Sequence, residues 1–557
     1  MTMKKPFAIT LDPGSSLANK TGSWRTERPV YVDRLPPCNA QCPAGEDIQG
    51  WLFHAESGDY QAAWRHLTRD NPFPAVMGRV CYHSCEGACN RGQIDAAVGI
   101  NSVERFLGDE ALKQGWQFTP PAAETGKHVL VVGAGPSGMS AAYHLRRQGH
   151  RVTVKEAGPL MGGMMRFGIP KYRLPREVLD AEVARLAAMG IALRLNHKVD
   201  DLAATLAAGP DGDGSRPYDA AFLAVGAHLA KRAFIPAKDS ARMLDAVQVL
   251  RSMEGEAPPQ LGRRVVVYGG GNTAIDAART ARRLGATEAV IVYRRSRERM
   301  PAHPAEIEEA LAEGVQVKWL STITQAEGSA DGSETLTIEK MRLDEHGMPQ
   351  PTGEFETLQA DALVLALGQD VDLGLLGRVD GLLQKDGVVQ VDPATLMTGH
   401  PGIFAGGDMV PAERNVTVAV GHGKRAARHI DAWLRGGPAV SVPEKATPAA
   451  FDRLNPWYYA DAPATLRPQL DAARRTSSFD EVQGGLTEAN ALFEARRCLS
   501  CGNCFECDNC YGVCPDNAVI KLGPGQRFEI NLDYCKGCGL CAAECPCGAI
   551  DMVAEPD

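Results

Sequence analysis

The sequence predicts a multidomain fold in which a small α-helical domain is followed by two nested, doubly wound α/β domains and a small C-terminal α+β domain. Three observations support this prediction. The chain has 557 residues, which is too long for a single hydrophobic core. Two glycine-rich turns each follow a β-rich run and precede an amphipathic stretch, as in βαβ units. The sixteen cysteines form two groups, one near each end of the chain.

The composition is that of a globular protein, with 44% hydrophobic and 23% charged residues. The 59 basic and 68 acidic residues give a net charge of -9. No basic run is long enough to follow a phosphate backbone, so we expect no nucleic-acid partner. No apolar run approaches the roughly 20 residues of a membrane span, and the N-terminus lacks a signal-peptide core. We therefore expect a cytoplasmic protein without a membrane span.

The cysteines are distributed very unevenly. Five lie between Cys38 and Cys89, and eleven lie between Cys498 and Cys547. Cytoplasmic thiols stay reduced, so this clustering indicates thiolates bound to metal rather than disulfides. Residues 1–120, which carry the first group among helix-like segments, are predicted to form a helical iron–sulfur domain.

The first glycine-rich turn has every part of a dinucleotide-binding fingerprint. A buried strand leads into Gly133-x-Gly135-x-x-Gly138, and a helix, a second strand and Glu156 follow. The glycines permit a tight turn, close approach of a pyrophosphate and close packing of helix on strand, while the acid can accept hydrogen bonds from ribose hydroxyls. The alternative is a tight turn in a sheet that binds no cofactor.

The second turn repeats the pattern with one change of charge. Two arginines stand where the acid would be, and guanidinium groups can hold a 2′-phosphate that an acid would repel. NADPH is thus favoured over NADH, although the arginines could also be solvated side chains at a strand end. The predicted nicotinamide-nucleotide contacts are Gly269, Gly271, Asn272, Ala274, Arg294 and Arg295.

The two units are predicted to be nested. Residues 121–235 and 356–435 form the first dinucleotide-binding domain, and residues 236–355 form the inserted one. VLALGQ at 364–369 is expected to return to the first sheet. Residues 436–495 are predicted to be a Pro-rich and Ala-rich linker followed by a weak helical pattern.

Two further segments point to a flavin. Gly406-Gly407-Asp408 follows a strand, and its aspartate can accept a hydrogen bond from a ribityl hydroxyl. The helix that begins near Thr417 is expected to aim its N-terminus at the flavin.

Together with GGMMRFGIPKYRLP at 162–175, these segments resemble the family of the glutamate synthase small subunit. The matching domains of dihydropyrimidine dehydrogenase and the bifurcating NADH-dependent ferredoxin:NADP oxidoreductase are similar, over residues from about 30 to 435. The resemblance implies that the first sheet binds FAD and the inserted sheet binds NAD(P)H. It also implies that Gly162, Gly163 and Ile169 line the flavin, beside Gly407 and Asp408.

The C-terminal cysteines have the bacterial ferredoxin spacing twice, each time ending in Cys-Pro. In this spacing the fourth cysteine of each run ligates the cluster of the other run. Residues 496–557 are therefore predicted to hold two [4Fe–4S] clusters, and a zinc site is the alternative. The expected ligand sets are Cys504, Cys507, Cys510 and Cys545 for one cluster, and Cys514, Cys535, Cys538 and Cys541 for the other.

The five N-terminal cysteines cannot fill two four-ligand clusters. Members of the resembling family carry an additional Arg-Cys-x-x-Cys just before the first pair, which this chain lacks there, whereas EARRCLSC immediately precedes the ferredoxin runs. We expect the C-terminal segment to fold back and complete a cluster; the alternative is that its two cysteines are spare or partner-facing thiols. The predicted ligands are Cys38, Cys89, Cys498 and Cys501.

The remaining N-terminal thiolates are Cys42, Cys81 and Cys85, which need a fourth ligand. The resemblance nominates Glu104 in GINSVERF, where relatives supply a Gln or Glu. The alternative is that Glu104 is a solvated helix residue. The prediction totals four [4Fe–4S] clusters and leaves Cys547 without a role.

The implied chemistry is hydride transfer between nicotinamide and flavin, followed by release of single electrons into the clusters. The chain is expected to be a subunit of a hetero-oligomer that connects NAD(P)H to ferredoxin or to a partner enzyme. By resemblance, the partner is a 2-oxoacid:ferredoxin oxidoreductase, a benzoyl-CoA reductase system or a glutamate synthase large subunit. A true glutamate synthase small subunit and a redox-sensing or scaffold protein without turnover are the alternatives.

Overall fold

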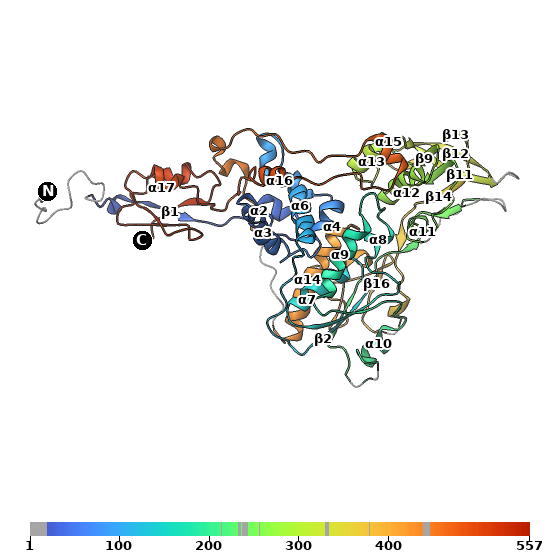
Figure 1. Cartoon of the computed structure of the whole chain (residues 1–557), viewed down its shortest axis with the longest axis horizontal. Helices are drawn as coiled ribbons and strands as arrows, with labels where there is room; N and C mark the ends of the chain where they lie inside the picture. Colours follow the sequence, from blue (N-terminus) through green and yellow to red (C-terminus); the bar gives the residue numbers. More distant parts are fainter. Residues whose placement is uncertain are drawn as a thin grey trace, which may run out of the picture.

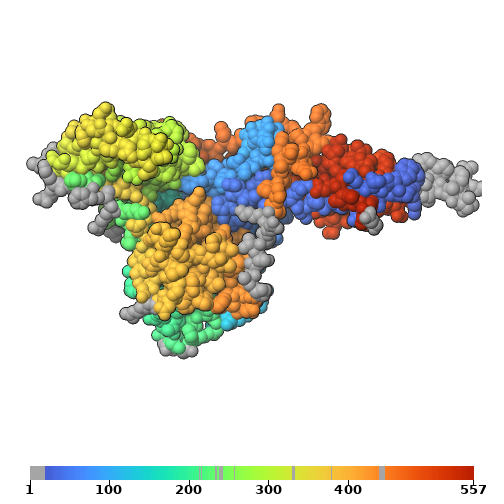
Figure 2. Space-filling model, turned by 180° about the vertical axis from the view of Figure 1, so that it is seen from behind, coloured from blue at the N-terminus to red at the C-terminus, as the bar shows by residue number. Residues whose placement is uncertain are grey.

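The computed structural model describes residues 19–212, 214, 216–231, 235–236, 243–255, 257–328, 333–377, 379–437 and 446–556. The molecule is elongated, with the C-terminal region at one end of the long axis and the inserted α/β unit at the other (Figure 1). The first α/β unit projects to one side of this axis, and the view from behind shows the same three-armed outline (Figure 2). Among the described residues, no helix combines the length and apolar character needed to cross a bilayer.

Short helices in the N-terminal region surround the first cysteine group. Their starts follow capping chemistry: the side chains of Asp47 and Asp59 accept the backbone N–H of Gly50 and Ala62, respectively, which satisfies otherwise unpaired helix donors. Buried Trp51 and other apolar side chains of these helices form a compact core. The helices are α1 (Pro37–Gln41), α2 (Ile48–Glu56), α3 (Tyr60–Leu67), α4 (Pro74–Val80), α5 (Ser84–Gly87) and α6 (Ile100–Lys113).

The first α/β unit is a five-stranded parallel sheet in the order β18-β5-β2-β3-β4. Its central strand is buried at every position, as expected where helices cover both faces of a parallel sheet. Helix α7 (Pro136–Arg147) follows this strand and packs against α14 (Val416–Leu434). The strands are β2 (His128–Val132), β3 (Arg151–Lys155), β4 (Ala192–Arg194), β5 (Ala220–Leu223) and β18 (Ile403–Ala405), and the other helices are α8 (Met164–Phe167), α9 (Arg176–Ala187) and α10 (Leu202–Ala208).

The second unit repeats this architecture with strand order β10-β9-β8-β14-β7. An antiparallel sheet, β11-β12-β13, is attached to it. Its strands are β7 (Met243–Asp245), β8 (Arg264–Tyr268), β9 (Glu288–Val292), β10 (Gln316–Lys318), β11 (Ser321–Gly328), β12 (Glu334–Leu343), β13 (Pro349–Ala360) and β14 (Ala362–Leu365), and its helices are α11 (Ala246–Ser252), α12 (Asn272–Arg283) and α13 (Pro304–Ala312).

One expectation about the nesting is wrong. The strand predicted at 364–369 to return to the first sheet is β14, which pairs in parallel with β8 and β7 of the second sheet. A buried apolar strand fits either sheet equally well by sequence, and only the pairing decides. The chain returns later, beside the short pairing of β6 (Leu229–Ala230) with β15 (Gln369–Asp370). A small hairpin of β16 (Gln384–Lys385) and β17 (Val388–Val389) follows.

After α14 the chain leaves the α/β units and runs along the long axis. From residue 446 onward it reaches the second unit, where α15 (Ala472–Ser477) packs on α12, and then returns to place α16 (Glu488–Ala495) against α2 and α6. The two passes are visible as long orange-red coil segments in Figure 1. The predicted weak helix of the linker is therefore two short helices on different parts of the molecule.

The C-terminal region includes the beginning of the described chain. Strand β1 (Glu27–Tyr31) pairs antiparallel with β21 (Ile550–Ala554), so two segments more than 500 residues apart share one ribbon. No sequence pattern indicated this pairing, because each strand is short and isolated. The other elements are β19 (Val519–Lys521), β20 (Phe528–Ile530), α17 (Asn509–Val513) and α18 (Leu540–Ala543).

Candidate cofactor sites

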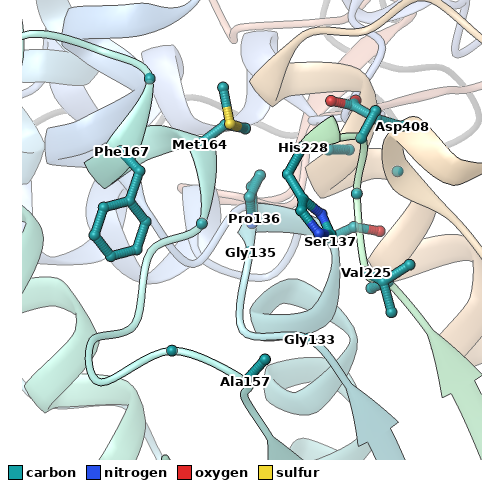
Figure 3. Close-up of a pocket in the computed structure, with 18 of the residues that line it drawn as sticks. Gly133, Gly135, Pro136, Ser137, Ala157, Met164, Phe167, Val225, His228 and Asp408 are labelled. Carbon is teal, nitrogen blue, oxygen red and sulfur yellow. The ribbon is translucent and has the colours of Figure 1, made fainter. Parts of the chain in front are cut away.

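A cavity of about 910 Å³ connects the two α/β units. Its walls include Gly133 and Gly135 from the first fingerprint and Asn272 from the second. Figure 3 shows the first-fingerprint side, where Pro136, Ser137, Met164, Phe167 and Asp408 surround the space. The first fingerprint and the start of α12 in the second unit therefore line one continuous cavity.

The glycines of the first fingerprint have the steric roles expected of them. Gly133 has φ 102°, and a Cβ there would lie 2.3 Å from the carbonyl oxygen of Ala224. A Cβ on Gly138 would lie 2.0 Å from the carbonyl oxygen of Gly133, and one on Gly163 would lie 2.7 Å from the Cα of Gly135. Any side chain at Gly133, Gly138 or Gly163 would collide with backbone, so the loop can close only with glycine.

The start of α7 presents unused donors to the cavity. Ser137 is buried, lines the cavity, and its hydroxyl has no hydrogen-bond partner among the described residues. An orphaned hydroxyl at a helix N-terminus fits a bound pyrophosphate, which accepts hydrogen bonds and is favoured by the helix dipole. The sequence pattern could have found Ser137, because it lies inside the fingerprint.

Glu156 occupies the predicted position after β3. Its carboxylate oxygens accept the backbone N–H of Ala134 and of Gly158, each at 2.8 Å, and the residue also lines the cavity. The carboxylate thus ties the fingerprint loop to the end of β3. Each oxygen has a second lone pair that a ribose hydroxyl can use.

The opposite wall comes from the loop before α14. Gly407 has φ 70°, and its N–H donates to His422 Nδ1 at 3.1 Å. Burial lowers the pKa of His422 to about 4, so the imidazole is neutral and able to accept this bond at neutral pH. Burial also raises the pKa of Asp408, which lines the cavity.

Two of the residues expected to line the flavin do not line this cavity. Thr417 lies in the first turn of α14, but its hydroxyl donates to Cys81 Sγ at 3.2 Å. Gly162 instead holds the loop, because its N–H donates to the carbonyl of Ala134 at 2.9 Å. Gly163 and Ile169 do line the cavity.

The second fingerprint has the same strained turn. Gly269 has φ 146°, and a Cβ there would lie 2.2 Å from the carbonyl oxygen of Ala366. Gly271 is open to solvent on its Cβ side, and Ala274 is fully buried in α12. The fingerprint therefore leaves the start of α12 accessible.

Arg294 and Arg295 follow β9 at the edge of this unit, outside the cavity lining. Arg294 is exposed, and among the described residues neither arginine has an acidic partner. Arg295 Nε is buried without a hydrogen-bond partner. Two guanidinium groups without an acidic partner at this position fit a phosphate-bearing ligand.

The C-terminal cysteines line two small cavities whose cysteine sets match the predicted crossed pattern. Cys547, which had no predicted role, also lines the first, and its Sγ lies 3.8 Å from Cys545 Sγ. Among the described residues no three His, Cys, Asp or Glu side chains are placed to hold a single metal ion. The cavities contain Cys504, Cys507, Cys510 and Cys545, and Cys514, Cys535, Cys538 and Cys541, respectively.

A third small cavity brings the two ends of the chain together. It is lined by Cys38, Cys89, Cys498 and Cys501, the four cysteines of the fold-back prediction. Burial raises the pKa of the Cys501 thiol to about 11, the amide of Asn90 opposes this by donating to its sulfur at 3.5 Å, and the Cys89 charge raises it further.

A buried ion pair holds the fold-back segment in place. The Arg497 guanidinium bonds to Glu494 Oε1 at 2.5 Å and to the carbonyl of Ala97 at 2.9 Å. Glu494 Oε1 also accepts the backbone N–H of Gly99 at 2.7 Å. Both side chains are almost completely buried, and Arg497 also pairs with Asp95 at 3.1 Å. Removing Arg497 would leave the buried Glu494 carboxylate without a cationic partner, at a cost of about 3–5 kcal/mol. Sequence reasoning missed this anchor.

The fourth cysteine group lies beside the large cavity. Burial raises the pKa of Cys42 and of Cys85, and the nearby Cys81 thiol raises both further. Glu104 is buried near them, and Asn71 and Asn101 donate to its two oxygens at 2.8 and 3.4 Å. Burial raises the pKa of Glu104 well above its usual range. Glu104 is therefore not a solvated helix residue.

The fold and these sites define a class of protein: an oxidoreductase with a flavin and pyridine-nucleotide cavity connected to cysteine-rich iron–sulfur regions. Residues 127–423 match the pyridine nucleotide-disulphide oxidoreductase family. Residues 26–116 match dihydropyrimidine dehydrogenase domain II, a 4Fe–4S domain, and residues 528–551 match a 4Fe–4S binding domain.

Curated relatives agree with these matches. The chain is 36% identical to the NADP(+)-dependent formate dehydrogenase subunit beta of Moorella thermoacetica, over 83% of this chain and 70% of the relative. It is 32% identical to the NADPH-Fe(3+) oxidoreductase subunit beta of Geobacter sulfurreducens, over 84% and 75%. It is also 32% identical to the glutamate synthase [NADPH] small chain of Escherichia coli, over 72% and 89%.

The chain belongs to the pyridine nucleotide-disulphide oxidoreductase family, within its glutamate synthase small subunit-like, iron–sulfur-containing group. The resemblance inferred from the glycine and cysteine motifs is confirmed. The protein is a pyridine-nucleotide-dependent flavin and iron–sulfur oxidoreductase.

Proposed function

We propose that this chain is an electron-transfer subunit that moves electrons between NADPH and a partner enzyme. The observation that carries the proposal is the single cavity shared by both fingerprints, whose wall includes Val80 and Tyr82 on either side of Cys81. The cofactors, when bound, supply hydride transfer to a flavin and one-electron transfer through iron–sulfur clusters. The protein orients these groups, excludes water and tunes their environment.

The four cysteine groups support a route with four [4Fe–4S] clusters. The Cys42, Cys81 and Cys85 group, with Glu104 as the proposed fourth ligand, adjoins the cavity. The Cys38 group follows, since Cys501 lies three residues from Cys504 of the next group. In Figure 1 the helices α2 and α6 lie between the α/β units and the C-terminal region with α17, so the groups follow the long axis.

NADPH is the proposed nucleotide because of charge. Arg294 and Arg295 lie at the end of β9 without acidic partners among the described residues, and a 2′-phosphate would satisfy them. The names of the Moorella, Geobacter and Escherichia relatives specify NADP(+) or NADPH, which supports the same choice.

The partner is proposed to be the catalytic subunit of a multi-subunit oxidoreductase. The Moorella and Geobacter relatives match a larger share of this chain than the glutamate synthase small chain does, and they are named as beta subunits of a formate dehydrogenase and of an Fe(3+) oxidoreductase. A 2-oxoacid:ferredoxin oxidoreductase or a benzoyl-CoA reductase system would use the same one-electron chemistry. Copurification of the native protein identifies the partner.

The exit face is proposed to lie beside Cys507, one of the exposed cysteines. Trp457 is 86% exposed. Its neighbour Tyr458 donates to Glu544 and lies near Cys507. A large exposed aromatic side chain beside a redox site is typical of a protein–protein contact. The C-terminal region carries an excess of acidic residues, which suits a partner with a basic face.

Anaerobic stopped-flow mixing tests the proposed function. The reconstituted protein is expected to contain about sixteen irons per chain, four for each cluster. NADPH should bleach its flavin absorbance and then its broad iron–sulfur absorbance, faster than NADH does. If neither nucleotide bleaches the flavin, the proposed electron transfer is refuted, and a redox-sensing or scaffold protein is the remaining alternative. A large amidotransferase partner, rather than another oxidoreductase subunit, would establish a glutamate synthase small subunit.

A further inference from the structure

Tyr82 lies where the iron–sulfur helices, the flavin-side cavity and the nucleotide unit meet. It directly follows Cys81 in the chain and lines the large cavity. Its ring stacks on His303 of the nucleotide unit, with centroids 4.6 Å apart and planes 10° apart. Asn272 Nδ2 donates to its hydroxyl at 2.5 Å.

Asn272 is the first residue of α12, the helix whose N-terminus is proposed to bind the nucleotide. Its amide oxygen accepts the backbone N–H of His303 at 2.8 Å. Both ends of the Asn272 side chain are therefore occupied by protein groups, one of which is Tyr82. The side chain predicted to contact the nucleotide instead fixes the beginning of the helix that contacts it.

The other side of the same loop is also fixed. Cys81 Sγ accepts the Thr417 hydroxyl and the backbone N–H of His83, each at 3.2 Å. Thr417 belongs to α14, whose start faces the flavin-side wall. Consecutive residues of one loop thus bond to the two helices that flank the cavity, Cys81 to α14 and Tyr82 to α12.

A buried ion pair beside Tyr82 makes this junction stiff. Arg173, from the turn after α8, bonds to Asp276 of α12 at 2.8 Å and to Glu306 of α13. Because these charges are paired and buried, a shift of α12 would break several strong interactions together. Tyr82 therefore contacts a rigid part of the nucleotide unit and not a mobile edge.

We propose that Tyr82 is a positioning residue for the nicotinamide nucleotide: through Asn272 it holds the N-terminus of α12 against the loop that carries Cys81, which couples nucleotide binding to the iron–sulfur site. The inference rests on the proposed function, because it requires α12 to bind the nucleotide. By linkage, a nucleotide that tightens this junction must also affect the cysteine site.

Calorimetric titration of the cluster-loaded protein with NADP+ tests the contact. Tyr82→Phe keeps the stacked ring but removes the hydroxyl, and should weaken NADP+ binding about two- to tenfold, as expected for one lost hydrogen bond. Asn272→Ala should weaken binding as well. The double variant should bind as Asn272→Ala does, because Tyr82 acts through Asn272. Wild-type affinity in Tyr82→Phe, or fully additive effects in the double variant, would overturn the proposal.

Electron paramagnetic resonance of the reduced protein tests the coupling. NADP+ should change the spectrum of one cluster in the wild type and leave it unchanged in Tyr82→Phe. An equal change in both proteins would refute coupling through Tyr82. His303→Ala, which removes only the stacking, should also reduce the effect.

The matched control is Tyr143→Phe. Tyr143 is buried, and its hydroxyl donates to the carbonyl of Thr68 at 2.6 Å, another bond between separate parts of the fold. It should lower stability without changing NADP+ affinity. Failure of wild-type protein to bind either nucleotide would contradict the proposed function itself, whereas wild-type binding that Tyr82→Phe does not alter contradicts only this inference.

Discussion

Mild acidification should protonate His422, and this should open the Gly407 loop and release the flavin. His422 Nδ1 accepts the Gly407 N–H, and a protonated imidazole cannot accept it. Burial, and then the positive charge of Arg425, lowers its pKa from 6.5 to about 4. When the loop opens, the imidazole regains its ordinary pKa, so the open state binds protons more readily than the closed state.

The sign and size of the effect follow from this difference. The neutral imidazole favours the closed loop fully above pH 6.5, and this preference is lost as the pH falls from 6.5 toward 4. Lowering the pKa of His422 from 6.5 to about 4 corresponds to about 3 kcal/mol in favour of the closed loop, of which about 2 kcal/mol is lost by pH 5. Loop opening should then be roughly 30-fold more favourable at pH 5 than at pH 8.

Flavin fluorescence measures the outcome, since free flavin is brighter than bound flavin. The rate of FAD loss from wild-type protein should rise steeply between pH 6.5 and 5. His422→Asn keeps an acceptor near the Gly407 N–H but cannot titrate, so its rate should depend much less on pH. Equal pH profiles for the two proteins would refute the role assigned to His422, whatever other groups titrate in this range.

Three further outcomes test the remaining sites. Replacing both Cys498 and Cys501 by Ala should remove one cluster, about four irons per chain by chemical assay, and leave the two ferredoxin-type clusters intact. Replacing both Arg294 and Arg295 by Glu should lower kcat/KM for NADPH about 10- to 100-fold and spare NADH, because charge-assisted hydrogen bonds to the 2′-phosphate are replaced by repulsion. Trp457→Ala should slow electron transfer to cytochrome c, a basic protein acceptor, several-fold while ferricyanide reduction is unchanged.

Each of these outcomes has a matched control. Cys547→Ser should retain all clusters, and an unchanged iron content in the double cysteine variant would contradict the fold-back site. Arg297→Glu alters an exposed arginine that is paired with Glu308, and should not change nucleotide preference. Leu466→Ala removes a side chain that is 87% exposed. If Leu466→Ala slows electron transfer to cytochrome c as much as Trp457→Ala does, Trp457 does not mark the exit face.

The local parts of the cofactor sites were predictable from sequence. Gly133 and Gly138 must be glycine because of contacts within one βα turn, and such contacts follow from spacing alone. The ferredoxin cysteines are similarly determined by short loops. The strand at 364–369 was assigned to the wrong sheet, because an apolar run indicates that a strand is buried but not which strands it pairs with.

The sequence pattern could not predict the contact that the Thr417 side chain makes. Its position at the start of α14 suggested a flavin contact, but a helical side chain can face either side, and here it faces Cys81. The role of Tyr82 could not be predicted either, although it directly follows the predicted ligand Cys81. Its partners Asn272 and His303 are about 190 and 220 residues away in the chain, so no local pattern indicates them.

By itself the sequence determined the chemistry of this protein: the fingerprints, the cysteine spacings and the class of cofactor that each can hold. Only the tertiary structure decided how these parts are connected. It paired β1 with β21, carried Cys498 and Cys501 back to Cys38 and Cys89, and placed Tyr82 between two helices. The physical reason is that spacing controls groups only a few bonds apart, whereas contacts across hundreds of residues depend on how buried surfaces and ion pairs fit once the whole chain has folded.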